Sequence, residues 1–164
     1  MYLPEGVLLD GISPEVIRNI GYPLRKEFRR IPKERARKQL GISLHDRLLV
    51  VLGGSQGAVA LNRWVKDNLE SLAAEGISTY CLTGMNNESS GVVQLEGLGG
   101  QIVTNRFVSF TDEMNTVLSA ADLVISRAGA GAIAEIVRCR IPSILIPYPF
   151  AAVNPQCLNG EFLE

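Results

Sequence analysis

The sequence predicts an α/β fold of the Rossmann-like, doubly wound type, in which helices cover both faces of a parallel sheet. Short apolar runs alternate along the chain with segments whose apolar residues recur at helical spacing. Glycines are concentrated where these apolar runs end. The length of 164 residues suits one domain, and 46% apolar residues can bury a core of ordinary size.

The elements follow one another in a regular order. Buried strands are expected at the short apolar runs 48–52, 77–82, 101–108, 122–126 and 143–146. Helices are expected where apolar residues repeat every three or four positions, over 61–72, 114–121 and 130–139. Residues 85–100 are polar and rich in glycine, so a loop or a weak helix is expected there. A last helix is expected to open at Asn154.

Composition excludes several classes of protein. Sixteen Lys and Arg stand against 17 Asp and Glu, so no whole-domain basic surface and no nucleic acid partner are expected. Three cysteines without a CxxC pair and a single histidine, His45, argue against a metal site, and no cofactor is expected. The sparse cysteines indicate reduced thiols and a cytoplasmic location. No apolar run reaches the ~18 residues of a membrane span, and the N-terminus does not resemble a signal peptide.

Half of the cations lie within residues 25–38, which hold eight Lys and Arg and two acidic residues. One interpretation is a solvated helix and linker. The other is a surface that attracts phosphates or an anionic membrane.

Candidate binding residues follow the strands, because a doubly wound sheet binds its ligand outside the carboxyl ends of its strands. Residues 53–58 form a glycine-rich segment whose backbone can approach a ligand, and the next helix would begin with free N–H groups suited to phosphate. Residues 126–132 form a second loop of small residues. Two such loops at one edge favour a ligand with a diphosphate. A plain strand-to-helix turn is the alternative for each.

Glu135 stands apart from the expected apolar stripe of its helix, which consists of Ile133, Ile136 and Val137. At about 100° per residue, it points roughly opposite that stripe. Its carboxylate can accept hydrogen bonds from both hydroxyls of a ribose. The alternative is a solvated acid near the helix N-terminus, where the helix dipole favours a negative charge.

Two further segments supply neutral polar groups at the same edge. The backbone of the turn at Thr111 can read the edge of a base, although a helix N-cap at Thr111 or Asp112 fits that turn equally well. The amides of Asn154, Gln156 and Asn159 both donate and accept hydrogen bonds, which suits sugar hydroxyls.

Together these segments resemble the MurG family of glycosyltransferases. The matching motifs, in chain order, are LVVLGGSQGA at 49–58, LN at 61–62, FVSFTDEM at 107–114, ADLVISRAGA with IAEI over 121–136, and PSILIPYP at 142–149. That family transfers N-acetylglucosamine from UDP-N-acetylglucosamine to a lipid-pyrophosphate-linked muramyl-pentapeptide in peptidoglycan synthesis. It has the GT-B fold, in which the active site lies between two Rossmann-like domains. The resemblance covers about residues 20–164 and implies the second, donor-binding domain.

The resemblance also implies domain limits and site residues. Residues 1–30 would be a linker or N-terminal extension, and residues 31–164 a donor-binding domain truncated at its C-terminal end. The implied contacts are Arg25 with the diphosphate, Gly54, Ser55 and Gln56 below it, the Thr111 backbone with uracil, Ala130, Gly131 and Ala132 with the phosphates, Glu135 with the ribose, and Gln156 with the sugar hydroxyls. The catalytic residues stay unassigned, because the base would come from the acceptor half.

The chain departs from the family pattern at several site positions. Ala132 stands where the family commonly has Thr, and Pro155 where His or Gln is usual. An acidic residue is usual near Val153, and Asn is usual at the position of Tyr22. Each lost charge-assisted contact is worth about 1.5–3 kcal/mol.

The expected function is therefore the donor-binding half of a glycosyltransferase that acts on a lipid-linked acceptor. The expected location is the cytoplasm, with peripheral association at the inner face of the plasma membrane. The acceptor half would come from a longer chain or a separate subunit, so this chain by itself is not expected to be active. Two alternatives stay open. One is a non-catalytic or degenerate nucleotide-sugar-binding module, favoured by Ala132 and Pro155; the other is another UDP-sugar enzyme, such as an epimerase or a hydrolase.

Overall fold

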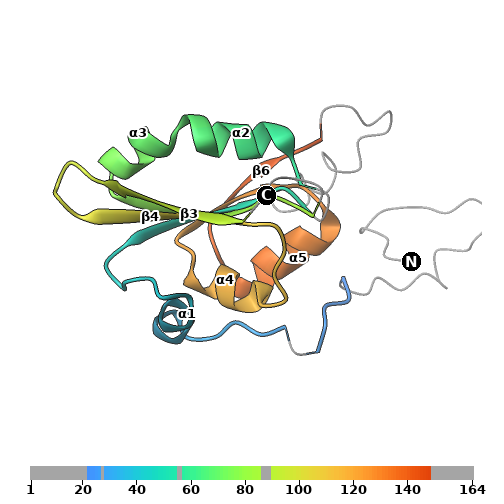
Figure 1. Cartoon of the computed structure of the whole chain (residues 1–164). Coiled ribbons are helices and arrows are strands. Elements are labelled where there is room, and N and C mark those ends of the chain that lie inside the picture. Colours follow the sequence, from blue (N-terminus) through green and yellow to red (C-terminus); the bar gives the residue numbers. More distant parts are fainter. Residues whose placement is uncertain (1–21, 27, 55–56, 86–89, 149–164) are drawn as a thin grey trace, which may run out of the picture.

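The computed structural model describes residues 22–26, 28–54, 57–85 and 90–148. Its strands are β1 (Arg47–Leu52), β2 (Ile77–Leu82), β3 (Gly91–Glu96), β4 (Ile102–Val108), β5 (Leu123–Arg127) and β6 (Ser143–Ile146). Its helices are α1 (Lys33–Leu40), α2 (Val59–Asp67), α3 (Leu69–Ala74), α4 (Met114–Ala120) and α5 (Ala130–Cys139). Helices α2 and α3 cover one face of the sheet, and α1, α4 and α5 cover the other (Figure 1). This arrangement confirms the predicted doubly wound α/β fold.

The strands form a single sheet in the order β3-β4-β2-β1-β5-β6. All neighbouring strands are parallel except β3, which runs antiparallel to β4. Strand β1 lies between β2 and β5, and its residues after Arg47 are all buried. Because both faces of this strand are covered, its sequence is an unbroken apolar run.

Strand β3 contradicts the prediction of a loop or a weak helix over 85–100. Residues 91–96 form the outer strand of the sheet and pair with β4 through a tight turn, in which the Gly97 N–H donates to the Gln101 carbonyl at 2.9 Å. Both faces of β3 stay largely exposed, as the 59% exposure of Val92 illustrates. An edge strand with no buried face lacks the apolar pattern that identifies buried strands.

The helix predicted over 61–72 is interrupted at Asn68 and forms α2 and α3. The Asn68 side chain donates from Nδ2 to the Trp64 carbonyl at 2.8 Å, which satisfies an acceptor at the end of α2. Gly76 adopts a φ of 70° in the turn that leads to β2, as expected from a glycine at this place. The interruption leaves the buried face intact, and Leu61 and Val65 pack on the sheet.

The core consists of two apolar clusters, one on each face of the sheet. The first joins β1, β2 and β5 to the helices α1, α4 and α5, and the second joins the other side of these strands to α2 and α3. Cys81 and Cys139 are buried free thiols in these clusters, and burial raises the pKa of Cys81 to about 11. These thiols are therefore ordinary core residues.

The basic segment 25–38 has mixed roles. Arg29, Arg30, Arg35 and Lys38 are exposed, as a solvated helix and linker would be. Arg37 contradicts that interpretation, because its side chain is only 1% exposed. Its guanidinium donates to Asp122 Oδ2 at 2.6 Å, and Lys33 donates to the other oxygen of the same carboxylate. Arg37 therefore anchors α1 to the start of β5.

Candidate functional site

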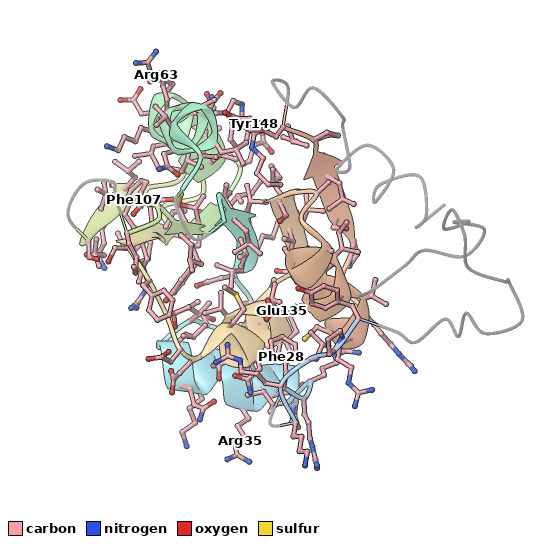
Figure 2. All side chains as sticks on the ribbon, turned by 90° about the vertical axis from the view of Figure 1, so that its right-hand side faces the viewer. Phe28, Arg35, Arg63, Phe107, Glu135 and Tyr148 are labelled. Atoms are coloured by element: carbon pink, nitrogen blue, oxygen red, sulfur yellow. The ribbon has the colours of Figure 1, made fainter. Side chains whose placement is uncertain are left out.

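A pocket of about 1220 Å³ opens where the parallel strands end. We call this end of the sheet the carboxyl edge; it comprises residues 52–54, 82, 109–111 and 126–127, which all line the pocket. Figure 2 faces this edge, with Tyr148 on the α2 side of the strand ends and Glu135 on the α5 side. The pocket therefore lies where the sequence placed the ligand of a doubly wound sheet.

The turn after β1 brings the backbone into the pocket wall. A Cβ on Gly53 would lie 2.5 Å from the backbone nitrogen of Ala58, so only glycine fits there. Gly54 and Gly57 adopt φ values of 83° and 79°, and the Gly57 N–H donates to the Gly54 carbonyl at 2.9 Å. The predicted tight glycine turn is confirmed, and Gly53 and Gly54 line the pocket. The predicted site residues Ser55 and Gln56 lie outside the described residues.

The loop after β5 leads directly into α5. Gly129 is the N-cap residue of α5 and provides no side-chain cap. The first turn of the helix therefore presents N–H groups for which the helix itself has no acceptors. Gly131 and Ala132 line the pocket, whereas Ala130 begins the helix without lining it. Tyr22 lies beside this turn, with Oη 3.4 Å from the position of a Cβ on Gly131.

Glu135 is half-buried in the pocket wall on α5, so the alternative of a solvated acid is wrong. Burial raises the pKa of its carboxyl group, and the positive charge of Arg25 acts in the opposite direction. Ile136 is buried, but Val137 is 50% exposed, so the apolar stripe expected for this helix is wrong at Val137. A half-buried carboxylate near a cation, in the same pocket as the first turn of α5, is well placed to accept hydrogen bonds from a polar ligand.

Arg25 and Thr111 line the pocket on the α4 and α5 side. Thr111 Oγ1 accepts a hydrogen bond from the Glu113 N–H at 3.1 Å. Glu113 itself is the N-cap residue of α4 and has no side-chain cap, so the alternative of an N-cap at Thr111 or Asp112 is wrong. The Thr111 hydroxyl thus stabilises the turn and leaves the turn's backbone at the pocket.

Arg127 and Tyr148 line the pocket but were not among the predicted site residues. Arg127 ends β5, and its guanidinium carbon lies 5.7 Å from the centre of the Tyr148 ring. The sequence carries a signal for Arg127, because this cation directly follows an apolar strand in the loop of small residues at 126–132. Tyr148 follows β6 between two prolines and had no comparable signal.

The α2 side of the pocket was also missed. One face of α2 and the residue after it line the pocket through Ala60, Arg63, Trp64, Asp67 and Asn68. The helical spacing of Leu61, Trp64 and Val65 predicted that Trp64 would be buried, but Trp64 is 39% exposed. Gln156, predicted to contact a sugar, and the helix expected from Asn154 lie outside the described residues.

The lining combines groups that suit an anionic, hydroxyl-bearing ligand. Backbone N–H groups at α5 and the guanidinium of Arg25 suit phosphate oxygens. The Glu135 carboxylate suits hydroxyl donors. His45 precedes β1, at the opposite end of the sheet, and is not part of the lining.

Comparison with known proteins agrees with this architecture. The glycosyltransferase family 28 C-terminal domain matches residues 48–164. Over its whole length the chain is 48% identical to the UDP-N-acetylglucosamine–N-acetylmuramyl-(pentapeptide) pyrophosphoryl-undecaprenol N-acetylglucosamine transferase of Opitutus terrae, of which it covers 44%. It is 34% identical to the enzyme of the same name from Aquifex aeolicus, with 92% of this chain and 42% of that protein covered.

A solved structure of MurG from Acinetobacter baumannii shares the fold, with a TM-score of 0.59 at 24% identity over 81% of this chain and 37% of that one. The chain thus spans less than half the length of these relatives. It belongs to glycosyltransferase family 28, matches the C-terminal domain of that family, and has the Rossmann-like fold of one half of a GT-B enzyme.

Proposed function

We propose that this chain binds UDP-N-acetylglucosamine as the donor-binding half of a glycosyltransferase, which transfers N-acetylglucosamine to a lipid-linked acceptor in peptidoglycan synthesis. The observation that carries the proposal is one pocket that combines the glycine turn after β1, the N-terminus of α5 and the carboxylate of Glu135. The names of the relatives from Opitutus terrae and Aquifex aeolicus support the choice of sugar and acceptor.

The proposed donor contacts follow the residues predicted from the sequence. Arg25 and the N–H groups of α5 meet the diphosphate, and Glu135 accepts the ribose hydroxyls. The Thr111 backbone meets the uracil. Arg25, Gly54, Thr111, Gly131, Ala132 and Glu135 all line the pocket, which supports these roles. Ala130, Ser55, Gln56 and Gln156 complete the proposed set.

The proposed chemistry needs no nucleophile from this chain. Transfer of the sugar leaves negative charge on UDP, and preorganised donors at α5 together with Arg25 stabilise that charge. The base that activates the acceptor hydroxyl comes from the acceptor-binding half, in a longer chain or a separate subunit. The chain by itself is therefore expected to bind the donor without turnover.

The alternatives carry less support. An epimerase or hydrolase would want its own carboxylates or a histidine at the sugar. His45 lies at the wrong end of the sheet, and the pocket lining holds Asp67 and Glu135, but the relatives are named as transferases, which favours the proposed function. A non-catalytic module is consistent with Ala132, which lacks a phosphate-binding hydroxyl. The other lining groups, Arg25 and Glu135 above all, favour a working donor site.

The proposal extends to domain limits and location. Residues 31–164 form the donor domain and residues 1–30 a linker or extension, of which Phe28 is packed into the core next to α1. We propose a cytoplasmic protein that associates with the inner face of the plasma membrane, where a lipid-linked acceptor is presented. Within the described ranges, every helix is too short or too polar to span a bilayer.

Titration calorimetry of the chain with UDP, UDP-N-acetylglucosamine and ADP tests the proposal. We expect heat of binding with both uridine nucleotides and none with ADP at the same concentration, because the Thr111 turn would read the base. Absence of binding by either uridine nucleotide would overturn the donor site. Turnover of a lipid-linked acceptor by the purified chain would contradict the need for a second half.

A further inference from the structure

The side chain of Arg127 joins the ends of β5 and β6. Its Nη1 donates to the carbonyl oxygens of Ile146 at 3.3 Å and Pro147 at 2.9 Å. In the parallel ladder, Arg127 and Ile146 form the last pair. Pro147 has no N–H, so the backbone cannot donate a further ladder hydrogen bond from that residue. The guanidinium of Arg127 therefore continues the contact between the two strands beyond the end of the ladder.

The same guanidinium fixes an aromatic side chain in the pocket wall. Its carbon lies 5.7 Å from the centre of the Tyr148 ring, within the range of a cation–π contact. Tyr148 is 47% exposed and lines the pocket on the α2 side of the strand ends, opposite Glu135 (Figure 2). Arg127 thus helps to hold Tyr148, and with it the part of the pocket wall that lies opposite Glu135.

Arg127 is not fully satisfied by the groups around it. Its Nε is buried and has no hydrogen-bond partner among the described residues. A buried donor without an acceptor lowers stability, so stability alone explains this arrangement poorly. A planar guanidinium with fixed donor directions is well suited to hold two carbonyls and a ring in one geometry.

We propose that Arg127 is a positioning residue of the nucleotide-sugar site. It holds the Ile146 and Pro147 carbonyls and the Tyr148 ring in place, so that Pro147 and Tyr148 form a fixed wall for the ligand. The inference deepens the proposed function and rests on it for the identity of the ligand. Arg127 acts through this wall, and no contact of Arg127 with the sugar nucleotide is required.

Affinity for UDP-N-acetylglucosamine in two variants tests this role at a temperature where both remain folded. Arg127→Met keeps similar length but removes the donors and the charge, and we expect a Kd up to about tenfold higher, because a wall without its anchor must be ordered when the ligand binds. Arg127→Lys keeps the charge without the planar fork, so we expect it to recover only part of the affinity. An unchanged Kd in Arg127→Met would mean a structural role only. Full recovery in Arg127→Lys would mean that charge alone suffices. Either result overturns the inference.

Hydrogen exchange at the Tyr148 amide provides a readout without nucleotide. We expect faster exchange in Arg127→Met, because the wall loses its anchor. Arg138→Met is the matched control, since Arg138 is exposed on α5, outside the pocket lining, and should leave both exchange and Kd unchanged. Failure of the unmodified chain to bind any uridine nucleotide would remove the proposed function. Equal exchange in the unmodified chain and Arg127→Met would remove the positioning role.

Discussion

The two ends of the sheet each carry an arginine whose side chain is largely inside the protein, and the two are bonded very differently. Arg37, at the end where the strands begin, donates from Nε to Ala120, from Nη1 to the carbonyls of Ser43, Leu44 and Asp46, and from Nη2 to Asp122. Arg127, at the carboxyl edge, reaches two carbonyls and leaves its Nε without a partner among the described residues.

This difference separates stability from binding. At the Arg37 end, which we call the amino edge, side chains and backbone satisfy one another and no ligand is needed. At the carboxyl edge, a glycine turn, a helix N-terminus and a half-buried carboxylate present groups that a ligand can use. Changes at the amino edge should therefore lower stability and leave binding unchanged. Changes at the carboxyl edge should alter binding and leave stability nearly unchanged.

Arg37→Met should produce the largest effect on stability. It removes five hydrogen bonds of a side chain that is 1% exposed, among them the one to the carbonyl of the buried Ala120. Because Asp122 is 38% exposed, the loss should be smaller than the about 3–5 kcal/mol that breaking a fully buried ion pair costs. Urea denaturation measures this loss, and the UDP affinity of the folded fraction should stay the same. A loss below about 1 kcal/mol would show that the amino edge is not an anchor.

Asp122→Asn should reduce the acid sensitivity of the same edge. Partial burial tends to raise the pKa of Asp122, but hydrogen bonds from Lys33 and the Leu48 N–H, with the charge of Arg37, outweigh it and lower the pKa below 3.8. A lowered folded-state pKa gives stability that is present above pH 3.8 and is lost as the pH falls through the folded value. Unfolding free energy against pH should therefore be flatter below pH 3.8 in Asp122→Asn, and an unchanged acid limb would contradict this.

Glu135→Gln should separate binding from stability at the carboxyl edge. If Glu135 accepts the ribose hydroxyls as proposed, removing the charge weakens those hydrogen bonds, and we expect a Kd for UDP about tenfold higher or more. Burial raises the pKa of Glu135 in the folded state, so stability falls as the pH rises from below 4.5 through the folded value. The variant lacks this fall, and its melting temperature at neutral pH should equal or slightly exceed that of the unmodified chain. Unchanged UDP affinity would remove Glu135 from the ribose site.

The comparison of the two edges also explains what the sequence could predict. Strand β1 was found because both of its faces are buried, which leaves an unbroken apolar run. Strand β3 was missed because neither face is buried. The burial of Arg37 was missed because its acidic partner, Asp122, lies 85 positions away, and a local run of cations gives no sign of such a contact.

In the candidate site too, local patterns could be predicted and contacts between distant residues could not. The strand-end argument found the glycine turn and Glu135, because a small-residue loop and an acid off the apolar stripe are local patterns. Arg127 escaped because its role depends on the carbonyls of Ile146 and Pro147, which the sheet brings beside it. Trp64 was not predicted as a site residue, because helical spacing does not show whether a side chain of α2 is covered by the rest of the protein or lies at the pocket.

Ala132→Thr should give the smallest effect, and it tests where the phosphate lies. Ala132 lines the pocket in the first turn of α5, where a hydroxyl could donate to a phosphate oxygen. Thr costs about 0.5 kcal/mol against Ala in a helix. A charge-assisted hydrogen bond is worth about 1.5–3 kcal/mol, so UDP should bind up to about tenfold more tightly. Ala132→Val is the matched control, because it has the same shape without the hydroxyl and should not tighten binding. Equal behaviour of the two variants would mean that the phosphate does not lie at α5. The free N–H groups of α5 would then no longer distinguish the carboxyl edge from the amino edge as a binding site.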